Sequence, residues 1–332
     1  MRPPAFWSDR RGGGWPARLL SPAAALYALA TARRMRRPGW RAPVPVLCCG
    51  NLTAGGTGKT TLALDLGARL LARGRAVHFL TRGYGGRLRG PLRVDPARHT
   101  AADVGDEALL LAQLAPCHVS ADRAAGARAA IAAGADCLVM DDGFQNPGLH
   151  QDMPLLVIDG AGGFGNRHVL PAGPLREPVA AGCSRARAAI LIGDDETGAL
   201  AQLPASLPVL RADLAMQDAA PLLAGRPAVA FAGIGRPGKF FDGLRRQDIT
   251  LAACVPFPDH HPYRAQDIRR LRDLAARHGA ALLTTAKDAI RLPNYIQKDI
   301  ITIGVHLTWP QPTAPDHLLD LFANTMKTQP GP

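Results

Sequence analysis

The chain has 332 residues, of which 47% are hydrophobic, so it is long enough for two domains or for one large domain with an appendage. Its formal net charge of +12 is concentrated in residues 1–41, where nine arginines face a single acidic residue, Asp9. A general nucleic-acid binder more often carries its charge on the folded body, so this distribution argues against nucleic acid as a partner. The six cysteines form no C-x-x-C pair and no zinc-like spacing, which favours buried free thiols.

Residues 1–41 are predicted to form a basic amphipathic segment that lies on a membrane surface. Ser21 and Pro22 are typical of an N-cap and a first helical position, so we expect a helix from Pro22 to Met35. Its apolar stretch, residues 19–32, is shorter than the roughly 20 residues that span a bilayer. Arginines would meet anionic head groups, and the aromatic anchors would be Phe6, Trp7, Trp15 and Trp40. A secretory signal and an ordinary helix packed on the body are the alternatives.

From residue 44 onward, short continuous apolar runs alternate with helical segments. Continuous runs are typical of strands buried on both faces, which predicts an α/β fold with a parallel sheet flanked by helices. Such a sheet binds its ligands at the carboxyl ends of the strands. Strands are expected at residues 44–49, 76–81, 117–120, 137–140, 155–158, 188–192, 228–232 and 281–285, and helices at 59–73, 106–114, 123–133, 238–245 and 265–278.

A Pro- and Ala-rich stretch, residues 196–227, is interpreted as irregular and as the place of a hinge. The predicted division is therefore a larger domain at 42–212, a linker at 213–227 and a smaller carboxy-terminal α/β domain at 228–326. Residues 327–332 are expected to be a disordered tail.

The strongest local motif follows the first strand and opens a helix, as a phosphate-binding P-loop requires. Glycines in such a loop let backbone N–H groups converge on phosphate oxygens, and the helix amino terminus adds partial positive charge. Lys59 would reach the β- and γ-phosphates, and the Thr60 hydroxyl would ligate Mg²⁺. The residues expected to bind the nucleotide are Thr53, Ala54, Gly55, Gly56, Thr57, Gly58, Lys59, Thr60 and Thr61. A glycine-rich turn that happens to end in Gly-Lys-Thr is the alternative.

An acidic pair ends a later apolar run, where a P-loop enzyme holds its metal ion. Asp141 and Asp142 would lie at the carboxyl edge of the sheet and, with Thr60, bind Mg²⁺ directly or through water. A turn-forming Asp-Asp-Gly is the alternative interpretation. Together the two motifs predict a P-loop NTPase-like fold.

In combination, the motifs resemble those of the tetraacyldisaccharide 4′-kinase family, whose members phosphorylate a lipid A precursor at the cytoplasmic face of the inner membrane in Gram-negative bacteria. The resemblance runs in order over about residues 45 to 290. The family also lacks the usual first P-loop glycine, at Thr53, but often has proline at position 108 and glutamate at position 286, where this chain has Ala108 and Ala286. The matching segments are 50–60, 81–85, 104–107, 141–145, 164–166, 170–177 and 257–263.

The resemblance implies roles for particular residues. Asp106 would be the base toward the sugar hydroxyl, aided by His260, with His261 left as the alternative partner. Arg176 and Glu177 would line the site with Lys59, and Asn51, Arg82 and Gln145 are candidates for contact with substrate. A nucleotide contact by Lys287 and Asp288 stays open because of Ala286.

The resemblance also implies an ATP- and Mg²⁺-dependent transfer to the 4′-hydroxyl of a tetraacyldisaccharide 1-phosphate. The enzyme would be a peripheral or monotopic protein of the anionic inner-membrane surface and a monomer. A membrane-associated ATPase switch of the Min/Par kind is the main alternative, although that class carries a lysine where this chain has Ala54. A GTPase, a lipid-binding scaffold and a small-molecule kinase without a membrane role are further alternatives.

Overall fold

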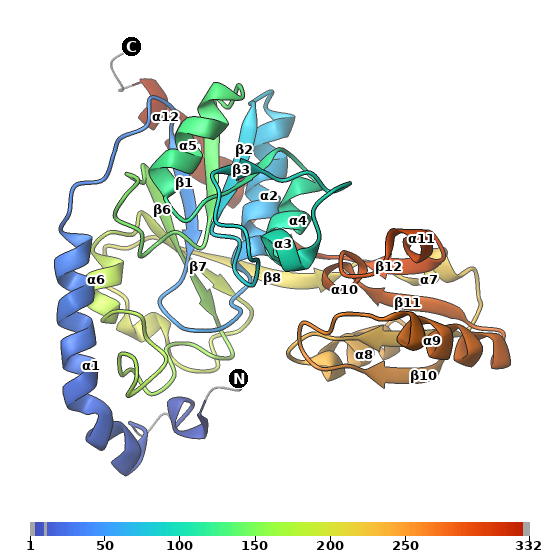
Figure 1. Ribbon diagram of the computed structural model, residues 1–332. Helices are drawn as coiled ribbons and strands as arrows, with labels where there is room; N and C mark the ends of the chain where they lie inside the picture. Colours follow the sequence, from blue (N-terminus) through green and yellow to red (C-terminus); the bar gives the residue numbers. More distant parts are fainter. Residues whose placement is uncertain (1–3, 10–11, 328–332) are drawn as a thin grey trace.

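The computed structural model describes residues 4–9 and 12–327, and a nine-stranded sheet forms the larger part of the molecule (Figure 1). Its strand order is β13-β8-β7-β6-β1-β5-β2-β4-β3. All pairings are parallel except those of the two edge strands, β13 with β8 and β3 with β4. The strands are β1 (Val46–Gly50), β2 (Val77–Thr81), β3 (Leu92–Arg93), β4 (Cys117–Val119), β5 (Cys137–Asp141), β6 (Met153–Asp159), β7 (Ala188–Ile192), β8 (Val209–Met216) and β13 (Val305–Thr308).

Helices cover both faces of this sheet, which confirms the predicted α/β class. The residues of β1, β2, β5 and β7 are all buried, as strands sandwiched between two helical layers must be. One face packs on α2 (Lys59–Ala72), α4 (Asp106–Ala112) and α12 (Ala314–Lys327), and the other on α5 (Arg123–Ala132) and α6 (Val179–Cys183). The short helices α3 (Ala101–Val104) and η2 (Leu200–Gln202) lie in connections.

A second, four-stranded sheet forms a separate lobe, at the right of Figure 1. Its strands are parallel in the order β10-β9-β11-β12, and helices pack on both faces, so the lobe has two apolar cores of its own. Its elements are α7 (Ala220–Leu223), β9 (Ala228–Ala232), α8 (Pro237–Arg245), β10 (Leu251–Pro256), α9 (Ala265–Arg277), β11 (Ala281–Thr285), α10 (Ala286–Ala289), α11 (Asn294–Gln297) and β12 (Ile300–Ile303).

The second lobe is an insertion at the tip of a hairpin. Strands β8 and β13 pair antiparallel, with Met216 opposite Val305, so residues 217–304 leave and rejoin the large sheet at one point. The predicted boundaries differ from this arrangement: residues 209–216 form a strand, and residues from Val305 onward return to the large sheet instead of staying in the smaller lobe. Strand β8 was not recognised because it is mostly exposed and lacks a continuous apolar run. Helix α12 includes Lys327, and the rest of the predicted tail lies outside the described residues.

Helix α1 (Gly14–Met35) begins earlier than expected. Gly13, with φ 75°, is its N-cap, so the prediction that Ser21 caps the helix is wrong. Ser21 instead donates its hydroxyl to the Ala17 carbonyl one turn back (2.8 Å), and Pro22 lies inside the helix. Over the residues described, the chain contains no helix with the length and apolar character needed to cross a bilayer.

The chain before α1 is tied to the body by a loop that the sequence motifs include. The backbone N–H of Asn166 donates to the Trp7 carbonyl (2.7 Å), and its side chain donates to the Phe6 carbonyl (3.1 Å), next to η1 (Ala5–Trp7). Trp40 also packs on the body, with the Arg128 guanidinium 4.2 Å above its ring. Among the four proposed aromatic anchors, Trp15 is largely exposed, at 75%, whereas Phe6, Trp7 and Trp40 are half-buried.

Candidate active site

The loop between β1 and α2 has the form of a phosphate cradle. Gly58, with φ 86°, begins α2 at a point where a Cβ would lie 2.6 Å from Ile192. At Gly55 and Gly56 an added Cβ would meet nothing within 4 Å, so this side of the loop is open to a ligand. The Thr57 hydroxyl is buried and has no hydrogen-bond partner among the described residues, which is typical of a group that awaits one.

The loop is held from both ends. Ala54 donates its N–H to the Pro174 carbonyl (2.8 Å), and Thr53 pairs with Leu175, so the predicted nucleotide loop rests on the segment that leads to Arg176. The buried Asn51 donates to the Thr53 carbonyl (2.8 Å) and accepts from the Lys59 ammonium (3.1 Å). Lys59 is thereby fixed before any phosphate arrives.

Two adjacent carboxylates end β5, as predicted, and their environments differ. The Thr60 hydroxyl donates to Asp141 Oδ2 (2.8 Å), while the buried Oδ1 has no partner in the described part of the chain. Burial raises the pKa of Asp141 to about 6, although the Lys59 charge and the Thr60 hydrogen bond oppose this rise. For Asp142 burial acts in the same direction, but the positive charges of Lys59 and Arg176 outweigh it and lower its pKa.

These oxygens fit Mg²⁺, which commonly takes one or two carboxylates and completes its shell with water and substrate phosphates. The described residues include no group of three or more His, Cys, Asp or Glu side chains arranged for a metal ion. The partnerless Asp141 oxygen beside the Thr60 hydroxyl fits a metal site that is shared with nucleotide phosphates.

Arg176 and Gln145 extend this cluster. The Arg176 guanidinium donates to Asp142 Oδ1 (2.9 Å), which the Lys59 ammonium approaches to 3.6 Å. Gln145 donates to the Asn51 carbonyl (2.9 Å) and to Glu177 (2.9 Å). Asn51, Gln145 and Arg176 thus lie together, as the sequence motifs suggested.

Glu177 is buried and occupied by a partner that sequence reasoning did not find. Two nitrogens of Arg185 donate to its two carboxylate oxygens, each at 2.8 Å. Such a bidentate pair neutralises the carboxylate. The geometry therefore indicates that Glu177 orients Gln145 and the surrounding loop.

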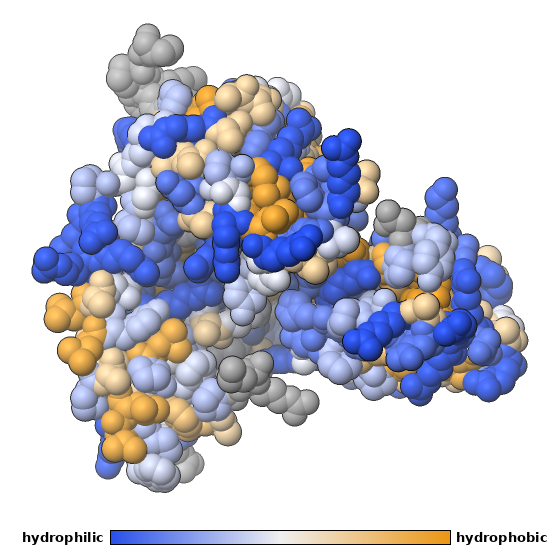
Figure 2. Space-filling view, in the orientation of Figure 1, coloured by the Kyte–Doolittle hydropathy of each residue, from blue (hydrophilic) through white to orange (hydrophobic). Residues whose placement is uncertain are grey.

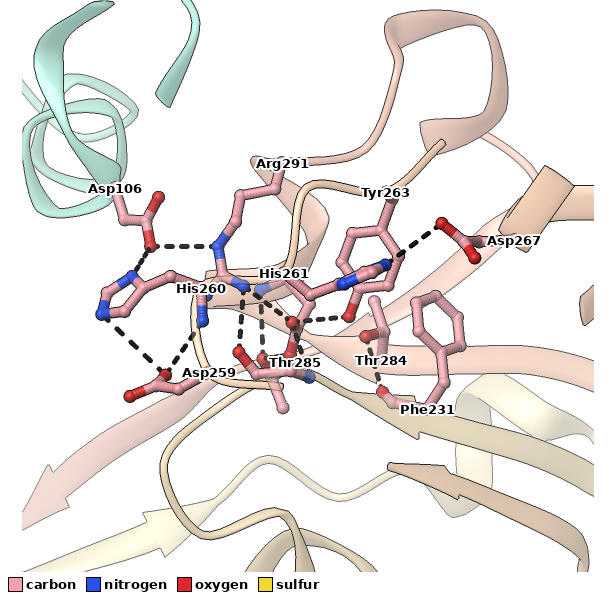
Figure 3. A network of polar contacts seen from close by, with 12 residues as sticks. Asp106, Phe231, Asp259, His260, His261, Tyr263, Asp267, Thr284, Thr285 and Arg291 are labelled. Atoms are coloured by element: carbon pink, nitrogen blue, oxygen red, sulfur yellow. Dashed lines mark hydrogen bonds and ion pairs between the residues drawn. The ribbon is translucent and has the colours of Figure 1, made fainter. Parts of the chain in front are cut away.

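Asp106, the first residue of α4, faces the smaller lobe (Figure 3). His260 Nδ1 lies 2.8 Å from Asp106 Oδ2, whereas His261 pairs with Asp267 (3.1 Å) and stacks on Phe257. The structure thus places His260, the favoured candidate, on the proposed base. The hydrogen bond to Asp106 raises the pKa of His260. Burial would raise the pKa of Asp106, but His260 and the charge of Arg291 outweigh it, so that this pKa is lowered.

Three cationic or ionisable side chains of the smaller lobe converge on two acids of α4. Besides His260, Arg291 Nε donates to Asp106 Oδ2 (3.0 Å), and the Lys287 ammonium lies 3.8 Å from Glu107. Burial is the main cause of the raised pKa of Asp141, and the charge of Glu107 adds a smaller contribution in the same direction. The acids of α4 and the acids that follow β5 are therefore close enough to interact electrostatically. Arg291 was not anticipated, since no motif in the sequence marks it.

Arg82 is not brought into direct contact with these groups. It is exposed at the end of β2. Burial is the main cause of the lowered pKa of Arg123, and the positive charge of Arg82 adds to it. Arg123 in turn donates hydrogen bonds to the carbonyl oxygens of Ser120 and Asp142. Arg82 therefore stands at the rim of the carboxyl edge.

Comparisons with known proteins point in one direction. The chain matches the family model described as tetraacyldisaccharide-1-P 4′-kinase over residues 16–323. It is 77% identical to the tetraacyldisaccharide 4′-kinase of Gluconacetobacter diazotrophicus over 97% of this chain and 98% of that protein, and 54% identical to that of Gluconobacter oxydans over 97% and 98%. A crystal structure of LpxK from Aquifex aeolicus in complex with ATP aligns with a TM-score of 0.76 and 27% identity, covering 92% of this chain and 99% of that chain.

Proposed function

Since this chain belongs to the tetraacyldisaccharide-1-P 4′-kinase family, we propose that it transfers the γ-phosphoryl group of ATP to the 4′-hydroxyl of a tetraacyldisaccharide 1-phosphate. The family match over residues 16–323, together with an open glycine loop that presents Lys59 beside two carboxylates, supports this most directly. A Min/Par-like ATPase switch has no comparable support. The relatives named as kinases match almost the whole chain.

The arrangement suits phosphoryl transfer, which depends mostly on positioning and charge stabilisation. The acceptor oxygen forms a bond to the γ-phosphorus, the bond to the β–γ bridging oxygen breaks, and ADP leaves with the electron pair. Asp106, ionised and held by His260, accepts the hydroxyl proton. Lys59 and Arg176 lie where positive charge stabilises the phosphates, and both are held in place by Asp142.

Thr60 and Asp141 would hold Mg²⁺ together with the phosphates, with Asp142 close by. When bound, the ion neutralises charge on the β- and γ-phosphate oxygens. The loop from Thr53 to Thr61 would hold the nucleotide through its N–H groups, its lysine and its hydroxyls. Asn51, Gln145 and Arg82 remain candidates for substrate contact at the rim of this site. Because one chain supplies every residue of the site, we expect a monomer.

We also propose that α1 docks on the anionic cytoplasmic face of the inner membrane as a peripheral element. Its buried side carries small residues, Ala17, Ala24 and Thr31, and its large apolar side chains are exposed. Figure 2 shows apolar residues gathered along α1 and strongly hydrophilic ones near its carboxyl end. The apolar group consists of Trp15, Leu19, Leu26, Tyr27 and Leu29, and the basic group of Arg33, Arg34, Arg36 and Arg37. Apolar area and basic charge together are what interfacial binding requires.

The kinase proposal is tested by transfer of ³²P from ATP to a monophosphorylated, acylated glucosamine disaccharide. Lys59→Met should lower kcat by about a hundredfold or more, because it removes a preorganised charge at the transferred group. Arg245→Gln, a surface ion pair of the second lobe, is the matched control and should behave like the wild type. Absence of magnesium-dependent transfer by the wild type would rule the proposal out.

The docking proposal is tested by flotation with vesicles that contain phosphatidylglycerol. Replacing Leu19, Leu26 and Leu29 by serine should abolish flotation, while the exposed Leu321→Ser on α12 should not. Replacing the four arginines by glutamine should weaken binding and reduce its dependence on salt. Undiminished flotation of the triple variant would contradict this role of α1.

A further inference from the structure

Arg291 joins the smaller lobe to the proposed base. It follows α10, and its guanidinium is almost fully buried, with 4% of the side chain exposed. Nε donates to Asp106 Oδ2 (3.0 Å), and Nη1 donates to the Gly233 carbonyl (3.0 Å) and to Asp288 Oδ1 (3.2 Å). Different nitrogens of one planar group therefore serve the two lobes.

Asp288, the anchor of Arg291, is itself rigidly held. It is completely buried and accepts hydrogen bonds from the Gly233 N–H (2.9 Å), the Tyr263 hydroxyl (2.7 Å) and the Thr285 hydroxyl (2.6 Å). Figure 3 shows Tyr263 and Thr285, two of these donors, close to the Arg291 side chain. A buried arginine held in this way cannot change its position without breaking several bonds, so it defines where Asp106 can lie.

The contacts of Asp106 are one-sided. His260 and Arg291 both bind Oδ2, and in the described part of the chain Oδ1 makes no hydrogen bond, which Figure 3 shows as the oxygen that points away from both. One carboxylate oxygen is thus used for orientation, and the other is left to accept a proton. His260 is half exposed whereas Arg291 is buried, so the arginine is the more rigid of the two supports.

We propose that Arg291, anchored by Asp288, is a positioning residue that orients Asp106 for the phosphoryl transfer and couples the smaller lobe to the base. The proposal rests on the proposed function, in which Asp106 accepts the proton of the acceptor hydroxyl. Arg291 keeps the carboxylate ionised and presents Oδ1 to that hydroxyl, while the proton ends on Oδ1. The charged groups that face Asp106 are His260, Arg291 and Lys287, and Glu107 is its acidic neighbour.

The closing experiment compares Arg291→Gln with Arg272→Gln, which breaks an exposed ion pair of the same lobe. For Arg291→Gln, kcat should fall about a hundredfold through misplacement of the base, with KM for ATP unchanged. The acid limb of the pH profile of kcat should move upward by about one unit, since the nearby positive charge is lost. A purely structural residue would lower the amount of folded protein without moving that limb. Arg272→Gln should match the wild type.

A second readout does not need activity. The imidazole of His260, identified in proton NMR spectra by its loss in His260→Gln, should titrate at higher pH in Arg291→Gln, because the Arg291 charge opposes its protonation. Arg291→Lys keeps the positive charge but loses the planar guanidinium, whose different nitrogens contact both lobes. This variant should retain the acid limb of the wild-type pH profile but have a reduced kcat. It also serves if the glutamine variant fails to fold.

An inactive wild type would contradict the proposed function, while the NMR titration would still test the contact. An active wild type with wild-type kcat and pH profile in Arg291→Gln would overturn this inference alone. A wild-type kcat in Arg291→Lys would show that the positive charge suffices without the guanidinium geometry, and it would overturn the positioning role.

Discussion

Asp141 and Asp142 are neighbours in sequence, yet their surroundings shift their pKa values in opposite directions. Asp141 is buried with one partnerless oxygen, whereas Asp142 turns back, with φ 54°, toward Lys59 and Arg176. The first is costly to keep ionised without a cation, and the second is stabilised as an anion. This difference fits the proposed roles, in which Asp141 receives a metal ion and Asp142 holds the side chains of Lys59 and Arg176.

This division predicts opposite effects of Asp141→Asn on stability and on turnover. At pH 7 the wild-type carboxyl, with a pKa of about 6, is ionised against the cost of burial, so the neutral amide should raise the thermal midpoint of the ligand-free protein. The amide oxygen can still accept from Thr60. Magnesium-dependent turnover should fall by at least about a hundredfold. Calorimetry and the ³²P assay check the two effects, and a lower midpoint would refute the burial argument.

A second residue-scale feature is a buried histidine pair away from the site. The rings of His78 on β2 and His118 on β4 stack with centroids 5.3 Å apart, and both nitrogens of His118 lack partners among the described residues. Burial lowers the pKa of His78, and burial together with the charge of His78 lowers the pKa of His118 to about 4. Both rings are therefore neutral at pH 7.

Because the folded state disfavours protonation of this pair, stability should be full above the ordinary histidine pKa of 6.5 and should fall as the pH drops toward 4. His118→Phe keeps a flat ring and removes one of the two titrating groups. Its thermal midpoint should decline less than that of the wild type between pH 6.5 and pH 4. His306→Phe on β13, an exposed position, is the control, and equal declines in all three proteins would contradict the explanation.

At the scale of elements, α2 presents the P-loop because it lies unusually close to the sheet. Gly67 faces β2, and a Cβ there would lie 2.5 Å from the Phe79 ring. The apolar residues Leu62, Leu66 and Leu70 flank this contact and bury the same side of the helix. The close approach of α2 to the sheet fixes the position of Lys59 and Thr60 relative to the carboxyl edge of the sheet.

Gly67→Ala therefore sets two effects against each other. Helix propensity alone would stabilise the protein by about 0.5–1 kcal/mol, whereas overpacking against Phe79 costs about 1–3 kcal/mol. We expect net destabilisation, measured as a lower urea midpoint. Phe79→Leu shortens the opposing side chain. In the Phe79→Leu background, Gly67→Ala should therefore lower the urea midpoint less than it does in the wild type. A stabilised single variant would show that α2 moves freely on the sheet.

At the scale of the whole molecule, the proposed catalytic residues are divided between two lobes that are joined at one hairpin. The P-loop lies on the large sheet, while His260 and Arg291 come from the insertion and reach across to Asp106. Gln217 and Gly304 bond to each other where the two connections meet, at 3.0 Å between the Gln217 nitrogen and the Gly304 oxygen. Movement of the insertion about this point would make or break the contacts on Asp106.

Replacing residues 217–304 by an Asn-Gly turn should leave a large domain that folds. Met216 and Val305 already face each other across the hairpin, and a two-residue turn closes such a pair. The shortened protein should unfold in one cooperative transition and bind Mg·ATP in calorimetry, but it should lose transfer to the lipid acceptor. Failure to fold would show that the insertion supports the large sheet.

The sequence by itself determined the parts whose pattern is local. Strand β1, the glycine loop and α2 were predicted because a buried run, a turn and an apolar helix face occur in immediate succession. The acidic pair after β5 was predicted for the same reason. The pairing of Asp106 with His260 came from family resemblance, since 154 residues separate them.

Only the tertiary structure decided what depends on distant or exposed segments. The edge strand β13 and its neighbour β8 carry too few buried residues to produce an apolar run, and their pairing returns the chain to the large sheet. Arg185 and Arg291 look like any surface arginine in sequence, because the partner of a charged side chain is set by the packing of whole elements. Arg291 meets Asp106 across 185 residues, and no local pattern can report a contact of that kind.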